Sequence, residues 1–470
     1  MFRGCLGLLL LLGVGEGLAL AQSAPPPSSI PIAVMSGPET GAMLPAQNPD
    51  GADKGKEPEK KQPAADPGKQ GQAQGCQNTQ NQNTQNTQNQ PTEEEKRAAL
   101  LRLDHSGPCE SVWFKGGFLL WWLRSAPPTG PLVTTGGPNA GILNNPDTQI
   151  LLGNDRFNFS GQTGITLEAG VWLDELHQWG LSASGFLLER TSQGTLFQSN
   201  AAGVPLLARP FTNVTKTTPS KEDSLVVAAP GVAAGTINVW TNTQLWGAEL
   251  NIFRNLVYTP QWNIHVLAGF RYLDLRDDLN IFQSSTRFTD GTTEVADRFT
   301  TRNQLYLGEV GATFEWAQGP FIVDLWSKVG LGPNHERGRN LGETLLPGAA
   351  NAVPGGLLAL PPTATLSSKP GLPVGNFGVH RTDWFVIVPE VGLDVGLQVT
   401  DHLRLSAGYS FLYINNVIRP GNQVNLNVNP SLVPSATAFG SPSGAGQPSV
   451  LTKTEDFWAH GLRVMIEFRF

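Results

Sequence analysis

The last ten residues of the chain, GLRVMIEFRF, constrain its fold more than any other segment. Apolar residues occupy every second position up to Phe470, and Arg463, Glu467 and Arg469 lie between them. A period of two predicts a strand with one apolar and one polar face. A soluble sheet would leave this apolar row and the open strand edge exposed. A transmembrane barrel instead pairs its last strand with its first and turns the apolar face to lipid. The segment therefore favours a barrel over the alternative, an edge strand of a soluble sandwich.

The same alternation recurs from Val112 onward in segments of roughly 10–15 residues, the length that a tilted barrel strand needs. The predicted strands are 112–124, 162–173, 179–190, 236–253, 261–273, 303–316, 320–331, 383–399, 402–416 and 457–470. Ten is an even count, as a chain with both ends on one side of the membrane requires. The segment 275–302 either extends a hairpin beyond the membrane or makes two more crossings, which would give twelve strands.

The connections between these strands alternate in length. Short ones lie at 174–178, 257–261, 317–319 and 400–402, and long ones at 125–161, 191–235, 274–302, 332–382 and 418–456. Short periplasmic turns and long external loops are typical of outer-membrane barrels. All 12 tryptophans lie in or near predicted strands, as aromatic rings at both membrane interfaces would produce. The sequence therefore predicts an all-β fold, a single antiparallel transmembrane β-barrel over 112–470 with long extracellular loops.

The segment before the barrel differs in composition. Residues 1–21 combine Arg3, an apolar run and the small-residue site Ala19-Leu20-Ala21, which predicts a secretory signal peptide. Residues 22–108 are rich in Pro, Gln, Asn and charged residues, and this composition predicts a disordered low-complexity periplasmic leader. Export would permit a disulfide between Cys76 and Cys109, but the sequence leaves their pairing open.

Composition and motifs exclude several function classes. The formal net charge of −7 and the absence of a basic block argue against a nucleic-acid partner. No motif for a catalytic nucleophile, a cofactor or a metal occurs, so we expect no enzyme, no cofactor and no metal site. His335 and His380 fall within one predicted loop and Asp383 directly follows it, and solvated charges explain these residues more simply than the Asp–His pair of a protease. Similarly, Arg419 precedes Pro420 and Gly421, which predict the end of a strand ladder, and a ligand-binding arginine is the alternative.

Charged residues on the polar faces of the strands are predicted to point into the lumen. They are Glu168, Arg271, Glu309, Glu315, Asp324, Lys328, Asp394, Arg404, Arg463, Glu467 and Arg469. Because both signs are present, these groups could pair across the lumen or line a narrow water-filled path. The sequence does not decide between a closed network and a pore, and it names no solute.

Several ordered motifs resemble a known family. They are FLLWWLRSAPPTGPLVTTG from Phe118, LARPF from Leu207, GAELN from Gly247, AGFRYL from Ala268 and GYSFLYINNVIRPGNQV from Gly408. Together they resemble the planctomycete outer-membrane family called putative beta-barrel porin-7, over roughly 112–470 of the chain. The resemblance implies an outer-membrane barrel, and it supplies no functional residues.

Three functions are consistent with these features. The first is a structural outer-membrane protein, or a narrow passive diffusion pore if the lumen is open. The second is a surface adhesin or receptor acting through its long loops, and the third is an omptin-like barrel protease. The expected partners are outer-membrane lipid and the barrel-assembly machinery, which would engage the terminal strand; the oligomeric state stays open.

The terminal strand gives a direct test. Phe468 and Phe470 are the predicted assembly signal, so deleting Phe470 or replacing both with Asp should abolish assembly. Ile466→Arg, on the lipid face, should cost roughly 2–4 kcal/mol near the midplane. Glu467→Gln, on the lumen face, should be tolerated much better. Refolding into vesicles measures this difference, and equal behaviour of the last two variants would contradict the assignment of faces.

Overall fold

The computed structural model describes residues 111–470, apart from 138–140, 175–176, 217–220, 260, 363–374 and 441–444. The predicted signal peptide and leader, and both Cys76 and Cys109, lie outside the described residues. None of the described residues forms a helix long and apolar enough to cross a membrane. All of them belong to one compact unit.

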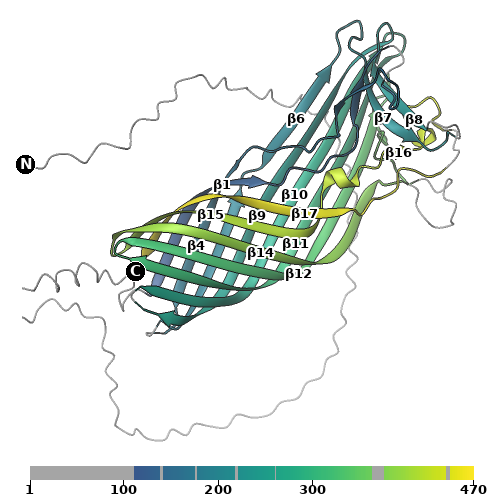
Figure 1. The fold of residues 1–470 in the computed structure, drawn as a ribbon. Helices are drawn as coiled ribbons and strands as arrows, with labels where there is room; N and C mark the ends of the chain where they lie inside the picture. The colour runs from purple at the N-terminus through teal and green to yellow at the C-terminus, as the bar shows by residue number, and fades with distance from the viewer. Residues whose placement is uncertain are drawn as a thin grey trace, which may run out of the picture. The chain divides into compact units, whose positions relative to one another are not determined.

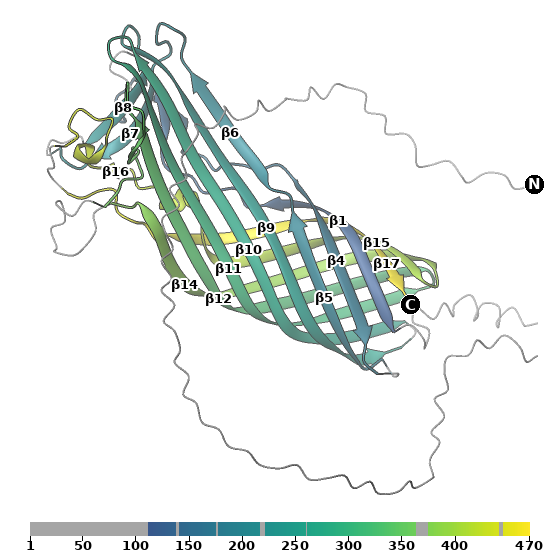
Figure 2. The same ribbon diagram turned by 180° about the vertical axis from the view of Figure 1, so that it is seen from behind.

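Ten antiparallel strands form a closed ring (Figures 1 and 2). They are β1 (Val112–Leu123), β4 (Gln162–Trp172), β5 (Trp179–Leu188), β9 (Ala233–Tyr258), β10 (Trp262–Arg287), β11 (Gly291–Gln318), β12 (Phe321–Leu345), β14 (Gly378–Thr400), β15 (Leu403–Ile418) and β17 (Thr454–Arg469). The ring closes where β17 pairs with β1, from Trp113 opposite Arg469 to Leu123 opposite Ala459. The predicted all-β barrel of ten strands is confirmed, and 275–302 extends the β10–β11 hairpin without further crossings.

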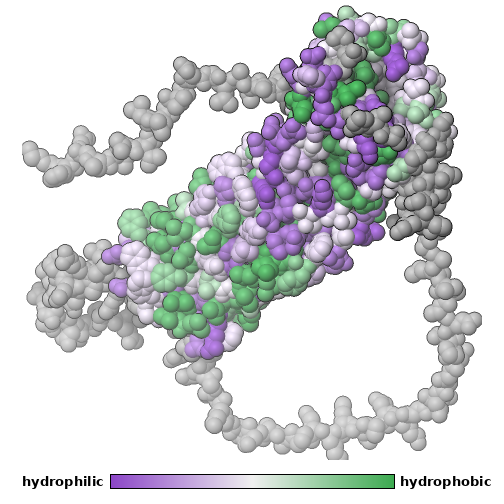
Figure 3. Space-filling model, turned by 45° about the vertical axis from the view of Figure 1, so that its right-hand side comes forward, coloured by the Kyte–Doolittle hydropathy of each residue, from purple (hydrophilic) through white to green (hydrophobic). Residues whose placement is uncertain are grey.

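The two faces of each strand differ as the terminal strand predicts. On β17, Val464 and Ile466 are 57% and 45% exposed on the outside, whereas Glu467 is 5% exposed inside. On the face drawn in Figure 3, hydrophobic residues gather over the half of the barrel where the short turns lie, and hydrophilic residues lie next to them toward the opposite end. We call these the short-turn end and the long-loop end. The apolar outer band is the surface that burial in lipid would stabilise.

The structure differs from two expectations about the strands and their tryptophans. The predicted long loop 332–382 is shorter than expected, because β12 runs on to Leu345 and β14 already begins at Gly378, well past the apolar band. Tryptophans do not all belong to outer girdles either. Trp113, Trp121, Trp172 and Trp326 line the lumen cavity, and Trp121 is only 4% exposed. These inward rings fill barrel volume that charged side chains alone would leave open.

The remaining long connections fold into a cap at the long-loop end. Its five-stranded sheet contains β2 (Val133–Thr135), β3 (Gln149–Leu152), β7 (Leu207–Asn213), β8 (Glu222–Ala228) and β16 (Asn427–Val428). Cap residues such as Val133 and Leu207 share one buried cluster with Ile281 and Phe299 of the barrel wall. The inward faces of the extended strands therefore supply the core on which the cap folds. Four short elements complete this region. Strand β6 (Thr191–Gln198) pairs with β9, and strand β13 (Val353–Pro354) pairs with β12. The other two are the 3-10 helices η2 (Pro420–Gln423) and η3 (Pro430–Leu432).

Two buried ion pairs hold the cap to the wall. The Arg209 guanidinium lies 2.7 Å from Asp297, which also accepts hydrogen bonds from the backbone N–H groups of Leu358 and Ala359 at 2.9 Å. Arg419, fully buried at the end of β15, lies 2.7 Å from Asp277 and donates to the carbonyl of Arg124 at 3.1 Å. Arg419 is thus tied to the protein itself, and the strand ends there as predicted.

Candidate functional site in the barrel lumen

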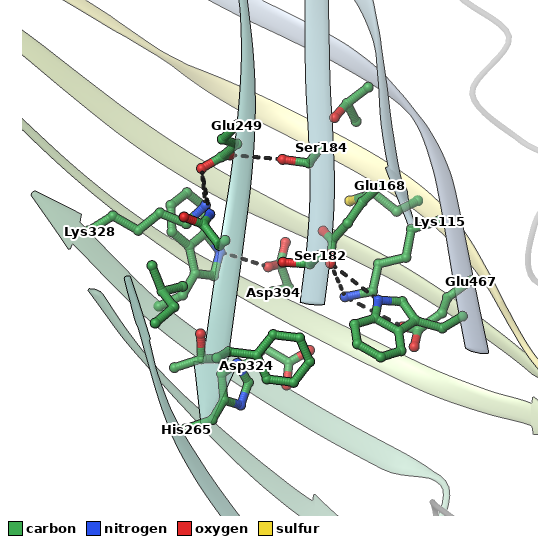
Figure 4. Close-up of a pocket in the computed structure, with 18 of the residues that line it drawn as sticks. Lys115, Glu168, Ser182, Ser184, Glu249, His265, Asp324, Lys328, Asp394 and Glu467 are labelled. Carbon is green, nitrogen blue, oxygen red and sulfur yellow. Dashed lines mark hydrogen bonds and ion pairs between the residues drawn. The ribbon is translucent and has the colours of Figure 1, made fainter. Parts of the chain in front are cut away.

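The lumen near the short-turn end holds a charged chamber with a cavity of about 240 Å³ (Figure 4). Strand alternation directs these side chains inward from the ring. Ten of the eleven charges singled out from the sequence line it, namely Glu168, Arg271, Glu315, Asp324, Lys328, Asp394, Arg404, Arg463, Glu467 and Arg469. The eleventh, Glu309, lies 3.1 Å from Arg271 and 3.8 Å from Lys328. The chamber therefore brings the whole set together.

Arg271 is the centre of one group in the chamber. Its guanidinium is 2% exposed and contacts the carboxylates of Glu309 and Glu390. Lys328 lies 2.7 Å from Glu249, which also accepts a hydrogen bond from Ser184 at 2.9 Å. Carboxylates from β9, β11 and β14 thus surround two cations from β10 and β12. The Arg271–Glu390 and Lys328–Glu249 pairs each link strands three places apart in the ring.

Arg404 is the centre of a second group, nearer the short-turn end. It lies 2.8 Å from Glu315 and 3.9 Å from Glu467. Lys115 lies 3.3 Å from Glu168 and 3.9 Å from Glu467. Arg469 donates to Glu467 at 2.6 Å. Glu467 therefore connects three cations from three different strands.

A third contact ties the aromatic wall to the charges. Arg463 pairs with Asp394, and its guanidinium lies 4.7 Å from the centre of the Trp326 ring. The Trp326 indole N–H donates to Asp394 at 3.1 Å. Buried charges of both signs are stable only when paired and hydrogen-bonded in this way.

Sequence reasoning missed three members of the chamber. Lys115, Glu249 and Glu390 were not among the predicted lumen charges, yet all three line the cavity. Glu390 shares the polar face of its predicted strand with Asp394, so the alternation could have found it. On β1 the signal is hidden, because Leu119 and Trp121 also point inward and make both faces of the strand apolar.

An apolar layer lies directly beyond the chamber, toward the long-loop end. Its members are buried, inward-facing side chains: Leu119, Trp121, Leu123, Leu188, Leu245, Leu273, Leu275, Leu305, Leu307, Val386, Val388, Leu412, Ile414, Val417, Phe457 and Ala459. They come from eight of the ten strands. The other two complete the ring with Gln162 of β4, 1% exposed, and Asn334 of β12, fully buried. Gly330 of β12 makes room for the layer, because a side chain there would meet Leu307 Cδ1 at 2.9 Å.

The layer closes the lumen. A side chain that lines an open pore keeps surface that water can reach, but Leu245, Leu273, Leu307 and Val388 have none. Every strand of the ring contributes a buried residue at this level. The chamber consequently ends against an apolar floor, and no continuous water-filled path runs along these side chains.

The histidines do not assemble a catalytic or metal site in the described part of the chain. No group of three or more potential metal ligands occurs there. His335 does contact Asp383 of β14, with 2.7 Å between Nδ1 and Oδ1, and His335 lies on strand β12 rather than in the predicted loop. Both side chains are about half exposed or more, at 51% and 67%, on the outside of the barrel. His380 instead contacts the carbonyl of Asn376 at 2.9 Å.

Comparison with known families fits this architecture. The family model described as "Putative beta barrel porin-7" matches residues 113–470. The chain belongs to this family. The family predicted from the motifs is confirmed, while the planctomycete origin stays a prediction. No curated protein matches the chain.

Among solved structures, this porin-7 member is similar to other barrels at low identity. The outer membrane protease OmpT from Escherichia coli is 10% identical, with 77% of this chain and 97% of that chain covered and a TM-score of 0.38. A Pseudomonas aeruginosa FadL homologue is 8% identical, with 77% and 91% covered and a TM-score of 0.21. The P. putida toluene transporter TodX is 10% identical, with 79% and 94% covered and a TM-score of 0.14. At these scores, the likeness says nothing about what this chain does.

Removing Arg271 tests the chamber of this porin-7 barrel. Arg271→Met leaves Glu309 and Glu390 without their shared cation, and we expect a loss of about 3–5 kcal/mol in the free energy of unfolding. Adding Glu309→Gln and Glu390→Gln should recover most of the loss, since no uncompensated charge then remains. Urea unfolding in lipid vesicles measures both. Arg254→Met, on the exposed outer wall, is the control, and an Arg271→Met midpoint equal to that of the control would contradict the pairing scheme.

Proposed function

We propose that this protein is a structural outer-membrane barrel that is closed to diffusion and holds a folded cap at the cell surface. The observation that carries the proposal is the apolar layer, which every strand of the ring completes with a buried residue. Ions avoid such a layer, because moving a charge into an apolar environment without a partner is strongly unfavourable. We propose no catalytic role.

Three features support placement in the outer membrane. The chain belongs to a porin family, its outer surface carries a continuous apolar band, and its strands close without a free edge at the C-terminus. Short turns then lie in the periplasm and the cap outside. Phe468 and Phe470, 42% and 66% exposed on the outer wall, are available to lipid and to the assembly machinery.

A receptor or adhesin role is the second candidate, and one observation favours it. The cap strand β3 lies at the end of its sheet, and Ile150 and Leu151 on it are 41% and 37% exposed. An apolar edge strand can pair with another chain. The protease candidate has less support, because His335 and Asp383 face outward beside the apolar band and do not line the lumen cavity.

Single-channel recording tests the closed lumen. Folded protein inserted in a planar bilayer should give no conductance steps above the baseline, because the apolar layer admits no hydrated ion. An open porin in the same bilayer is the positive control, and heat-modifiable gel mobility shows that the protein is folded. Discrete, stable conductance steps from the folded protein would contradict the proposal.

A further inference from the structure

An aromatic row marks the upper limit of the apolar band on the outer wall. Trp246 of β9, Tyr272 of β10, Tyr306 of β11 and His335 of β12 contact one another in sequence, with ring centroids 5.1, 5.1 and 5.4 Å apart. Aromatic side chains of this kind gather where the hydrocarbon region meets the lipid headgroups. The aromatic row therefore locates the headgroup region just beyond it, toward the long-loop end.

Four arginines occupy that position on four neighbouring strands. Arg276 of β10 lies opposite Arg302 of β11, Arg302 lies opposite Arg337 of β12, and Arg337 lies opposite Arg381 of β14. We call them the arginine row. Their strand positions place all four on the outer face, and Arg276, Arg337 and Arg381 are exposed.

The distance between the two rows suits a lipid headgroup. Arg276 and Arg302 are four residues beyond Tyr272 and Tyr306, and Arg337 is two beyond His335. At about 3.3 Å per residue and a strand tilt of about 40°, the arginine row lies within about 10 Å of the aromatic row. That is the depth of the headgroup layer.

Four neighbouring arginines repel one another unless an anion lies between them. Like charges directly opposite each other on neighbouring strands, about 4.8 Å apart, destabilise a sheet. Asp274 compensates Arg302 at 2.6 Å, and Asp278 lies 3.9 Å from Arg276. Within the described residues, neither Arg337 nor Arg381 forms an ion pair. The nearby Asp383 carboxylate contacts His335 instead. The row thus leaves two adjacent guanidinium groups available to an anion.

We propose that the arginine row binds the phosphate groups of lipid headgroups in the outer leaflet. A guanidinium group presents two parallel N–H donors that match two phosphate oxygens. Four arginines at strand spacing span about 14 Å, wide enough for a headgroup that carries two phosphates. The proposal rests on the outer-membrane placement proposed above.

Lipid binding by paired variants tests the arginine row. Arg337→Gln with Arg381→Gln removes the two unpaired cations. As the control, Arg287→Gln with Arg298→Gln removes two arginines of β10 and β11 that lie outside the row, nearer the tip of their hairpin. Folded proteins in detergent are titrated with a diphosphorylated glycolipid and with the same glycolipid after removal of its phosphates, with bound lipid counted by native mass spectrometry. Wild type and control should prefer the phosphorylated form, and the row variant should bind it at least about tenfold more weakly.

Several outcomes overturn the inference. The first is that the row variant binds the phosphorylated glycolipid as tightly as the control does. The second is that wild type binds the phosphorylated and the dephosphorylated glycolipid equally well. Inorganic phosphate is titrated in parallel, and displacement of the lipid at an equal phosphate concentration would show a site for free phosphate instead. If the double variant fails to fold, the single variant Arg381→Gln takes its place, and its binding of the phosphorylated glycolipid is compared with that of the control. Failure of wild type to insert into vesicles would instead overturn the outer-membrane placement.

Discussion

A ring of ten strands must fill its own interior, and the rest of this structure depends on how that is done. The strands enclose more volume than backbone alone can occupy, so inward side chains decide whether the lumen is solid or open. Here they form successive levels along the barrel. The charged chamber comes first, then the apolar layer, then the Arg419–Asp277 pair, and last the core shared with the cap.

Pairing inside the lumen follows from the cost of burial. An isolated charge in an apolar interior is strongly unfavourable, whereas a hydrogen-bonded pair is tolerated. Each buried arginine inside the barrel or under the cap accordingly meets a carboxylate from another strand or segment, as Arg271 meets Glu390 and Arg209 meets Asp297. Since the partners belong to distant parts of the chain, these pairs also fix which strands lie across from each other. The apolar layer and the core shared with the cap are two separate buried clusters within the same ring of strands.

The sequence was sufficient to predict the ring, because period-two alternation is strong wherever one face meets lipid. That pattern predicts ten strands and their order, and it predicts that Glu467 faces the lumen while Ile466 faces outward. The pattern fails where both faces are alike. Leu119 and Trp121 look like a continuous apolar run, so the inward position of Lys115 and the presence of an apolar layer were hidden. Beyond the membrane, Leu279 and Phe299 are buried by the cap, a contact between distant segments that local periodicity cannot reveal.

Accessibility of single cysteines inside the lumen tests the closed barrel most directly. In a chain in which Cys5, Cys76 and Cys109 are all replaced by Ser, Ser182→Cys places a thiol on the chamber wall and Leu307→Cys places one in the apolar layer. A small, charged, water-soluble thiol reagent is applied to folded protein in vesicles, and modification is followed by mass. The account predicts that the Ser182→Cys variant is modified and the Leu307→Cys variant is protected. Modification of both at similar rates would show that water passes the apolar layer, and it would contradict the closed lumen.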